Sequence, residues 1–266
     1  MKSLILVTFL EGVRSRVLYG VFMFALFVVF LSVVFSNFFM QDLGKVAVDF
    51  NVSAIAFAGL LLSASLSVNL IAKDLDKRTI YFVLSRPISR CQYICGKYLG
   101  MMAVFLFAYL ILTGISSLVL LYLQGVNVGY FESFRWLAYF QAVYFDFLKI
   151  LVFNSIIVFF SVVTTSSFVN LLFSLSIYVV GQSISDVVNF ISTGSGQEKT
   201  TPAVQNIIAI VKYLVPNFES FDFKVISAHG MLVSASEFVF FTLYGLVYAA
   251  IMLSFAVIIF RNKDLL

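Results

Sequence analysis

YLGMMAVFLFAYLILTGISSLVLLYLQGVNVGYF, residues 98–131, runs through the middle of the chain without one charged side chain. A membrane-spanning helix needs about 20 consecutive, mostly apolar residues. Four further uncharged stretches reach that length, at residues 17–41, 50–72, 150–185 and 238–260. The whole chain is 62% hydrophobic and 11% charged, whereas about a quarter of the residues of a soluble domain are charged. This composition excludes a soluble globule and predicts an all-α integral membrane protein.

The stretch 150–185 is too long for one span. As a single helix it would extend about 54 Å, against roughly 30 Å of hydrocarbon in a bilayer. Ser and Thr side chains at 164–167 interrupt it, so we expect a tight turn there. The chain then forms one polytopic domain, residues 1–266, with six transmembrane helices at about 17–35, 52–72, 98–121, 141–163, 168–188 and 238–260.

The segments between the spans differ in character. Residues 1–16 predict a short interfacial elbow helix before the first span. We expect a loop that contains Asp42, Lys45 and Asp49, and a second loop at 124–140, where Trp136 suits a membrane interface. Residues 189–236 form the longest non-spanning segment, and a short surface helix is predicted between Pro202 and Pro216.

Charge gathers between the second and third spans. Six of the 17 Lys and Arg residues lie from Lys73 to Lys97. Six spans place this segment and both termini on one side, which carries eleven basic residues against four acidic ones. The other side carries six basic residues against nine acidic ones. By the positive-inside rule, the termini and the charged segment are cytoplasmic.

Capping signals divide the charged segment into two helix starts. Asp76 is a candidate N-cap for a short helix that runs to Leu84, and Pro87 ends it. Ser89 and Gln92 form a capping-box pattern that starts the next helix. A second capping box, Ser234 with Glu237, precedes the last span.

These residues resemble the permease subunits of type-two ABC exporters. In that family the region reads Glu-x-Glu-x-Gly-Thr, then Leu-Leu-x-x-Pro-hydrophobic-Ser-Arg, then Gly-Lys. The matching positions are Asp74, Asp76, Arg78, Thr79, Val83, Leu84, Pro87, Ile88, Ser89, Arg90, Gly96 and Lys97. The acids are Asp instead of Glu, and Arg78 replaces the Gly. Both ends of the chain and residues 214–218 are similar to the branch that includes copper-enzyme-maturation permeases.

The resemblance implies that residues 73–97 hold a coupling helix, which docks on a separate cytoplasmic ABC ATPase subunit. That subunit would bind ATP and Mg, and the complex would pair this permease with a second copy or a sister permease in a bacterial cytoplasmic (inner) membrane. The exporter would move its cargo by alternating access. The implied coupling residues are Asp74, Asp76, Arg78, Thr79, Tyr81, Phe82, Arg86, Pro87, Ser89 and Arg90.

The resemblance also points to spans two and five for the substrate path. The small or polar side chains there are Ser63, Ser67, Ser174, Gln182 and Ser183. Close packing between helices explains each of them equally well. A path with few charges suits an amphipathic, lipid-like cargo.

The chain lacks the motifs of an enzyme. It has no Gly-rich phosphate loop that ends in Lys-Ser or Lys-Thr, so we expect no ATPase site, no catalytic residues and no cofactor or metal in this chain, and no nucleic-acid partner. Cys91 and Cys95, four residues apart, fit small packing residues on one helix face. The i, i+3 spacing of Asp146 and Lys149 permits an ion pair in the outer turns of the fourth span.

Three alternatives remain open at this point. A secondary transporter or ion channel usually places ionisable groups near the middle of the membrane, whereas the inner halves of these spans carry none. A membrane anchor that recruits a partner protein would also use a charged loop. An intramembrane enzyme would have only Asp146, Lys149 and Asp186 to work with.

Overall fold

The computed structural model describes residues 2–36, 43–67, 89–164, 166–192, 211 and 214–262, and this part of the chain is helical without a strand. The all-α prediction is therefore confirmed. The helices are α1 (Lys2–Val13), α2 (Arg16–Ser36), α3 (Leu43–Ser67), α6 (Arg90–Val126), α7 (Trp136–Val163), α8 (Ser167–Ser192), α10 (Lys224–Ala228) and α11 (Ala235–Asn262), with 3-10 turns η2 (Val128–Tyr130) and η3 (Glu219–Phe221).

Five helices are long and apolar enough to cross a membrane: α3, α6, α7, α8 and α11. A sixth span results if α1 and α2 are taken together as one broken span, bent by 55°. The chain is an integral membrane protein with five or six candidate spans. The short helix expected near the N-terminus corresponds to α1, and its position at the membrane surface stays a prediction.

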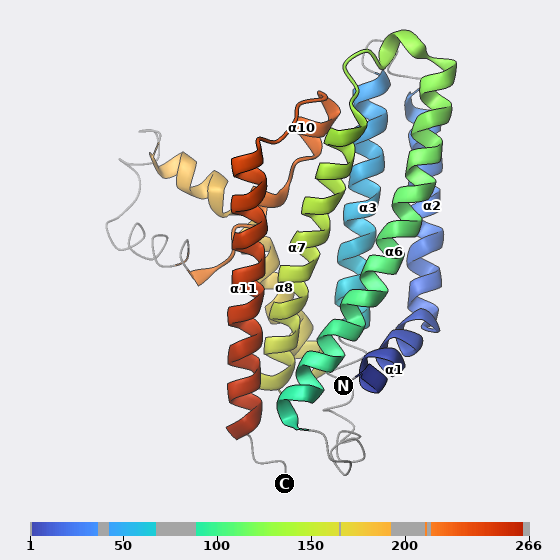
Figure 1. The fold of residues 1–266 in the computed structure, drawn as a ribbon. Helices are drawn as coiled ribbons and strands as arrows, with labels where there is room; N and C mark the ends of the chain where they lie inside the picture. Colours follow the sequence, from blue (N-terminus) through green and yellow to red (C-terminus); the bar gives the residue numbers. More distant parts are fainter. Residues whose placement is uncertain are drawn as a thin grey trace.

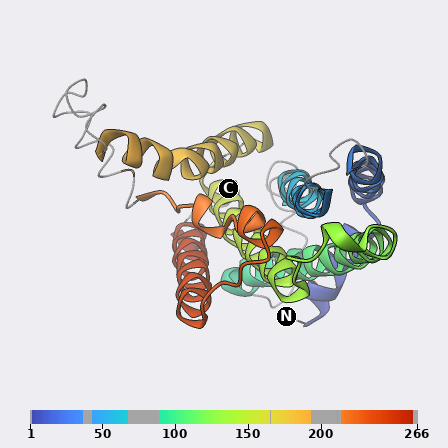
Figure 2. The ribbon, with the colours of Figure 1, turned by 90° about the horizontal axis from the view of Figure 1, so that it is seen from above.

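Helix α7 occupies the centre of the bundle (Figure 2). It packs against α3, α6, α8 and α11, while α2 packs on α3 and α1 packs on α6. Helix α1, the first turn of α6 and the last turn of α11 lie at one end of the bundle, which we call the terminal end (Figure 1). The connection from α6 to α7 and helix α10 lie at the opposite end.

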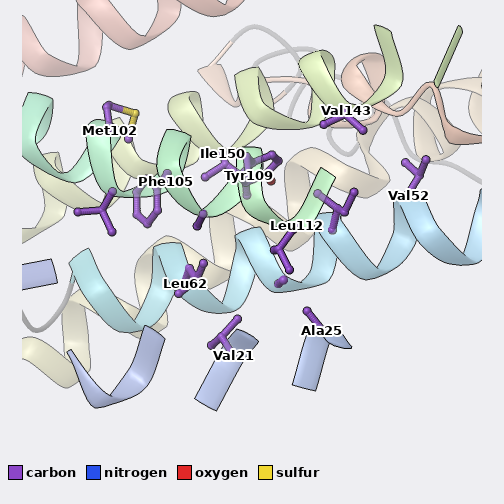
Figure 3. Close-up of a cluster of buried hydrophobic side chains, with 14 of the residues drawn as sticks. Val21, Ala25, Val52, Leu62, Met102, Phe105, Tyr109, Leu112, Val143 and Ile150 are labelled. Atoms are coloured by element: carbon purple, nitrogen blue, oxygen red, sulfur yellow. The ribbon is translucent and has the colours of Figure 1, made fainter. Parts of the chain in front are cut away.

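The main core joins α2, α3, α6 and α7. Figure 3 shows side chains from these four helices meeting along α3, among them Val21, Leu62, Phe105 and Ile150. Helix α3 approaches its neighbours closely because its inward residues are small: a Cβ atom on Gly59 would collide with the ring of Tyr109. More than half of the apolar part of α3 is buried inside the bundle.

Several predicted boundaries were wrong because a charged or amphipathic residue can extend a helix past its apolar part. Helix α3 begins at Leu43, so Lys45 and Asp49 lie in a helix and not in a loop. Helix α7 begins at Trp136, five residues before the predicted start at 141. The predicted turn near 164–167 is confirmed, since α7 ends at Val163 and α8 begins at Ser167.

The chain between Pro216 and Phe223 enters the bundle, which the sequence analysis did not anticipate. Phe218 and Phe221 are buried in a second core with residues of α7, where the Phe218 ring lies 6.2 Å from Phe153. The N–H of Phe218 donates to the carbonyl of Gly181 in α8 at 3.0 Å. The surface helix expected between Pro202 and Pro216 lies almost wholly outside the described residues.

Candidate functional site

The first turn of α6 is fixed by a reciprocal cap. The N–H of Gln92 donates to Ser89 Oγ, and the N–H of Ser89 donates to Gln92 Oε1, each at 3.2 Å. The pair satisfies two backbone donors that the start of a helix leaves unpaired. The predicted capping box is confirmed, and it sets the point at which the charged segment becomes α6.

Arg90 joins this turn to the end of α11. Its Nη1 donates to the carbonyl oxygens of Phe260 and Arg261, both at 3.0 Å. The guanidinium carbon lies 5.8 Å from the centre of the Phe260 ring, and the ring of Tyr93 stacks on Phe260 at 6.0 Å. A cation at a helix C-terminus offsets the partial negative charge of unpaired carbonyls. Arg90 thus has a structural partner within the chain.

Helix α1 crosses α6 at glycines that leave room for it. A Cβ atom on Gly96 would lie 2.7 Å from Leu4, and one on Gly100 would lie 2.6 Å from Thr8. On the α1 side, a Cβ atom on Gly12 would lie 2.6 Å from Val104. At Gly100 the added atom would also lie 3.0 Å from the carbonyl oxygen of Ile5, so a larger residue there would push α1 away from α6.

A salt bridge completes the α1–α6 contact. Lys97 Nζ lies 3.6 Å from Glu11 Oε2, and the Lys97 side chain is 6% exposed. The Gly96-Lys97 dipeptide that the sequence analysis singled out therefore has a physical role here: the glycine admits α1 and the lysine binds it. We call this set of contacts of the α6 start, with α1 and with the end of α11, the terminal junction.

A buried ion pair lies inside the bundle. Lys149 Nζ lies 3.3 Å from Asp146 Oδ1, and both side chains are less than a tenth exposed. The hydroxyl of Tyr109 in α6 donates to Asp146 Oδ2 at 2.6 Å. The predicted pairing is confirmed. The pair lies farther from the start of its helix than expected: since α7 begins at Trp136, Asp146 lies about 15 Å along it.

A second ion pair faces the first across a small cavity. Lys224 Nζ lies 3.3 Å from Asp222 Oδ2, where the entering segment meets α10. The cavity has a volume of about 30 Å³, and all four charged residues line it together with residues of α3. A cavity of this size and polarity has room for about two water molecules. The two pairs thus share one small cavity between α7, α3 and the segment that enters the bundle.

A polar network ties four helices together toward the opposite end. Asn51 of α3 donates to Ser32 Oγ of α2 at 3.0 Å and accepts from Ser116 Oγ of α6 at 2.9 Å. The hydroxyl of Tyr139 of α7 donates to Ser116 Oγ at 2.9 Å. All four side chains are fully buried. The sequence analysis missed this network, although an Asn in a span of small residues was a signal for one.

The predicted coupling residues fall mostly outside the described part of the chain. Asp74, Asp76, Arg78, Thr79, Tyr81, Phe82, Arg86 and Pro87 lie there, and their roles stay predictions. Ser89 and Arg90 are described, and both belong to the terminal junction.

The predicted path residues have different surroundings. Ser63 is buried, and its hydroxyl has no hydrogen-bond partner. Ser174 is buried, and its hydroxyl donates to Asn170 Oδ1 at 3.2 Å. Gln182 is half-buried and its Oε1 atom has no partner, whereas Ser183 is exposed. The side chain of Ser67 is not among those described, so the path stays a prediction.

The model of a family described as "ABC-2 family transporter protein" matches residues 8–265, which is nearly the whole chain. None of the curated proteins matches.

Proposed function

This chain belongs to the ABC-2 transporter family as a membrane permease, and we propose on that premise that it is the transport subunit of an exporter. A permease of this family works with an ABC ATPase subunit. We propose that the ATPase docks on residues 73–97 in the cytoplasm, that both termini are cytoplasmic, and that a second copy or a sister permease completes the complex in a bacterial cytoplasmic (inner) membrane. The ATPase would bind ATP and Mg. Within the family, we propose that this chain belongs to the branch of copper-enzyme-maturation permeases.

One observation carries the coupling part of this proposal: α6 begins within the charged segment, at Arg90, and is attached to both α1 and α11 within its first three turns. Arg90 binds the last carbonyls of α11, and Lys97 binds Glu11 of α1. A force applied to the charged segment therefore acts on three helices together. This arrangement supports alternating access, in which movement of the ATPase reorients the spans.

The length of α6 supports a docking surface outside the membrane. Its 37 residues extend about 55 Å, well beyond a hydrocarbon core of roughly 30 Å. The charged residues of α6, Arg90 and Lys97, lie in its first eight residues. The terminal junction thus fits the water-exposed or interfacial part of the helix, next to the proposed coupling helix.

The proposed cargo is amphipathic and lipid-like, and Ser63, Ser67, Ser174, Gln182 and Ser183 are the proposed path residues. The buried Asp146 and Lys149 neutralise each other, so no net charge from this pair faces a cargo. Reconstituted vesicles test the assignment: ATP hydrolysis by the complex increases with a lipid-like cargo. Stimulation by charged, water-soluble compounds alone would contradict it.

The docking proposal is tested with an epitope-tagged full-length chain purified from native membranes. We expect an ABC ATPase, identified by peptides that include its phosphate-binding loop, to co-purify with the wild type. Charge reversal by Asp76→Lys or Arg78→Glu removes it. Glu132→Lys is the matched control, because Glu132 is exposed near the opposite end of the bundle. Full retention of the ATPase by both charge-reversed variants would overturn the proposal.

A further inference from the structure

An open groove of about 440 Å³ lies between α6 and α7. Figure 1 shows the two helices close together near the terminal end and diverging toward the opposite end, where the groove lies. Its walls come from residues 106–117 of α6 and residues 140–147 of α7. Tyr109 and Val143 form a floor that is less than a tenth exposed, whereas Leu110 and Phe140 form a rim that is 64% and 48% exposed.

The surface of the groove is almost wholly apolar. Hydroxyl groups in its lining are bound within the chain: Ser117 Oγ donates to the carbonyl of Thr113 at 2.7 Å, and the hydroxyl of Tyr144 lies 3.3 Å from Thr242 Oγ1. Pockets of this volume that are lined mainly by apolar and aromatic side chains are typical of sites for small, apolar ligands.

We propose that this groove holds one acyl chain of a membrane phospholipid. Both helices are long and apolar enough to cross a membrane, so the medium beside the exposed rim is hydrocarbon. From Leu106 to Ser117, α6 rises about 16 Å, and 440 Å³ spread over that length gives a channel about 5–6 Å wide. A single acyl chain fits this width.

A protein partner does not fit the groove. A helix with its side chains is about 10–12 Å wide, roughly twice the width of the channel. A stable interface uses about 20–30 residues from each partner, whereas ten residues line the groove. The groove is therefore too narrow to admit a helix and too small to be the contact with a second copy of the chain.

Trp136 marks the end of the groove that lies nearest the membrane surface. Trp136, Phe140, Val143 and Phe147 are spaced four, three and four residues apart, so they share one face of α7. The ring of Trp136 lies 6.1 Å from that of Phe140. Tryptophan is enriched at the level of lipid headgroups. The headgroup of the bound lipid therefore lies near Trp136, and its chain extends from Phe140 toward Phe147.

This site is separate from the proposed cargo path on α3 and α8. The ring of Tyr109 forms part of the floor and lies 5.4 Å from the ring of Phe147, while its hydroxyl donates to Asp146 at 2.6 Å. An acyl chain in the groove covers the two rings and leaves the ion pair of Asp146 and Lys149 in place. Lipid binding does not depend on the proposed function, so it can be tested without an ATPase or a cargo.

The test uses the fluorescence of Trp136, the single tryptophan of the chain. The full-length chain is reconstituted into vesicles of phosphatidylcholine brominated near the headgroup end of its acyl chains, because bromine quenches a tryptophan that it contacts. The vesicles are then dissolved in a large excess of lipid-free detergent. We expect quenching to persist in the wild type, since the groove retains its acyl chain, and to reverse when unbrominated phosphatidylcholine is added.

Two substitutions fill the groove, and a third is the matched control. Gly114 lines the groove and a Cβ atom there would meet nothing within 4 Å, so Gly114→Phe places a ring in the space of the acyl chain. Thr113→Phe fills it from the neighbouring position. Gly20→Phe adds the same ring to α2, where a Cβ atom also meets nothing within 4 Å.

We expect both filling variants to lose the quenching that persists in detergent, and Gly20→Phe to keep it. Mass spectrometry of the same samples is expected to find one phospholipid per wild-type chain and none in the filling variants. Full recovery of the wild-type fluorescence on transfer to detergent would overturn the proposal. Persistent quenching in both filling variants, or an equal loss in Gly20→Phe, would contradict the placement of the lipid in this groove.

Discussion

Asp146→Asn is expected to destabilise the chain by removing the carboxylate that pairs directly with the buried Lys149 ammonium. The substitution keeps the shape of the side chain and an oxygen that can accept from Tyr109. It removes only the negative charge that lies 3.3 Å from Lys149 Nζ. The effect therefore reports on the charge pair and not on packing.

Two independent estimates give the magnitude. Removing one partner of a buried ion pair costs about 3–5 kcal/mol. A lysine at the centre of a membrane helix costs about 2.5–3.5 kcal/mol on insertion scales. The first estimate applies because Lys149 is 5% exposed, and the second, for a lysine in lipid, has the same order of magnitude. We expect the free energy of unfolding to fall by about 3 kcal/mol, roughly a hundredfold in the ratio of folded to unfolded chain.

The assay is unfolding by denaturing detergent, followed by the fluorescence of the single tryptophan. Trp136 is a suitable reporter because it begins α7 and its ring contacts Phe134, Tyr139 and Phe140. The double variant Asp146→Asn/Lys149→Met removes both charges, and we expect it to lie within about 1 kcal/mol of the wild type, since neutral replacements of buried pairs are often tolerated.

The free energies of unfolding of the single and double variants show whether the two charges neutralise each other. If Asp146→Asn costs less than about 1 kcal/mol, Lys149 does not carry an uncompensated charge in the bundle. If the double variant is as unstable as the single one, the loss comes from packing or from the Tyr109 hydrogen bond. Either outcome would refute the assignment of a buried, mutually neutralising pair.

Three further substitutions test the terminal junction and the polar network. Gly100→Leu places a large side chain where Thr8 approaches, and we expect it to lower the free energy of unfolding by about 1–3 kcal/mol. It also separates α1 from α6, and the rate at which a protease cuts α1 measures this separation. Arg90→Gln removes the positive charge at the end of α11, and we expect it to lower the free energy of unfolding by about 0.5–1 kcal/mol. Hydrogen exchange of the backbone amides in the last turn of α11 is expected to become faster. Asn51→Leu leaves Ser116 without its acceptor and costs about 1–3 kcal/mol in the same unfolding assay.

Each of these has a matched control in the chain. Gly114→Leu places the same side chain on α6 where an added Cβ meets nothing within 4 Å, and it leaves α1 in place. Arg135→Gln removes an arginine at the start of α7 that makes no side-chain cap. Ser254→Ala removes a hydroxyl bonded only within its own helix, to Ala250 at 2.7 Å. Equal effects in a variant and its control would contradict the proposed contact.

The features that could be predicted from the sequence are those that depend on residues close together along the chain. Apolar runs located the spans, because a membrane helix must satisfy its backbone within one continuous segment. The Ser89 cap and the Asp146–Lys149 pair join residues three apart, so the helix periodicity alone brings them together. The boundaries were less accurate, since hydropathy ends where the apolar part ends and α3 continues past Asp49 to Leu43.

The sequence could not predict contacts that depend on which helices become neighbours. Arg90 and Phe260 are 170 residues apart, and no local pattern links them. The same holds for Lys97 and Glu11. The buried segment did leave a trace, because Phe218 and Phe221 are three residues apart in a region otherwise expected at the surface.

The buried segment also sets an order of events during biosynthesis. Phe218 packs against α7 and Gly181 of α8, which enter the membrane before the segment is made. A Cβ atom on Gly245 of α11 would lie 3.2 Å from Phe221, so a further wall of its pocket comes from a helix that follows the segment in the sequence. The segment is therefore enclosed on all these sides only when α11 is in place. A chain truncated before α11 would therefore leave the Phe221 ring uncovered on that side.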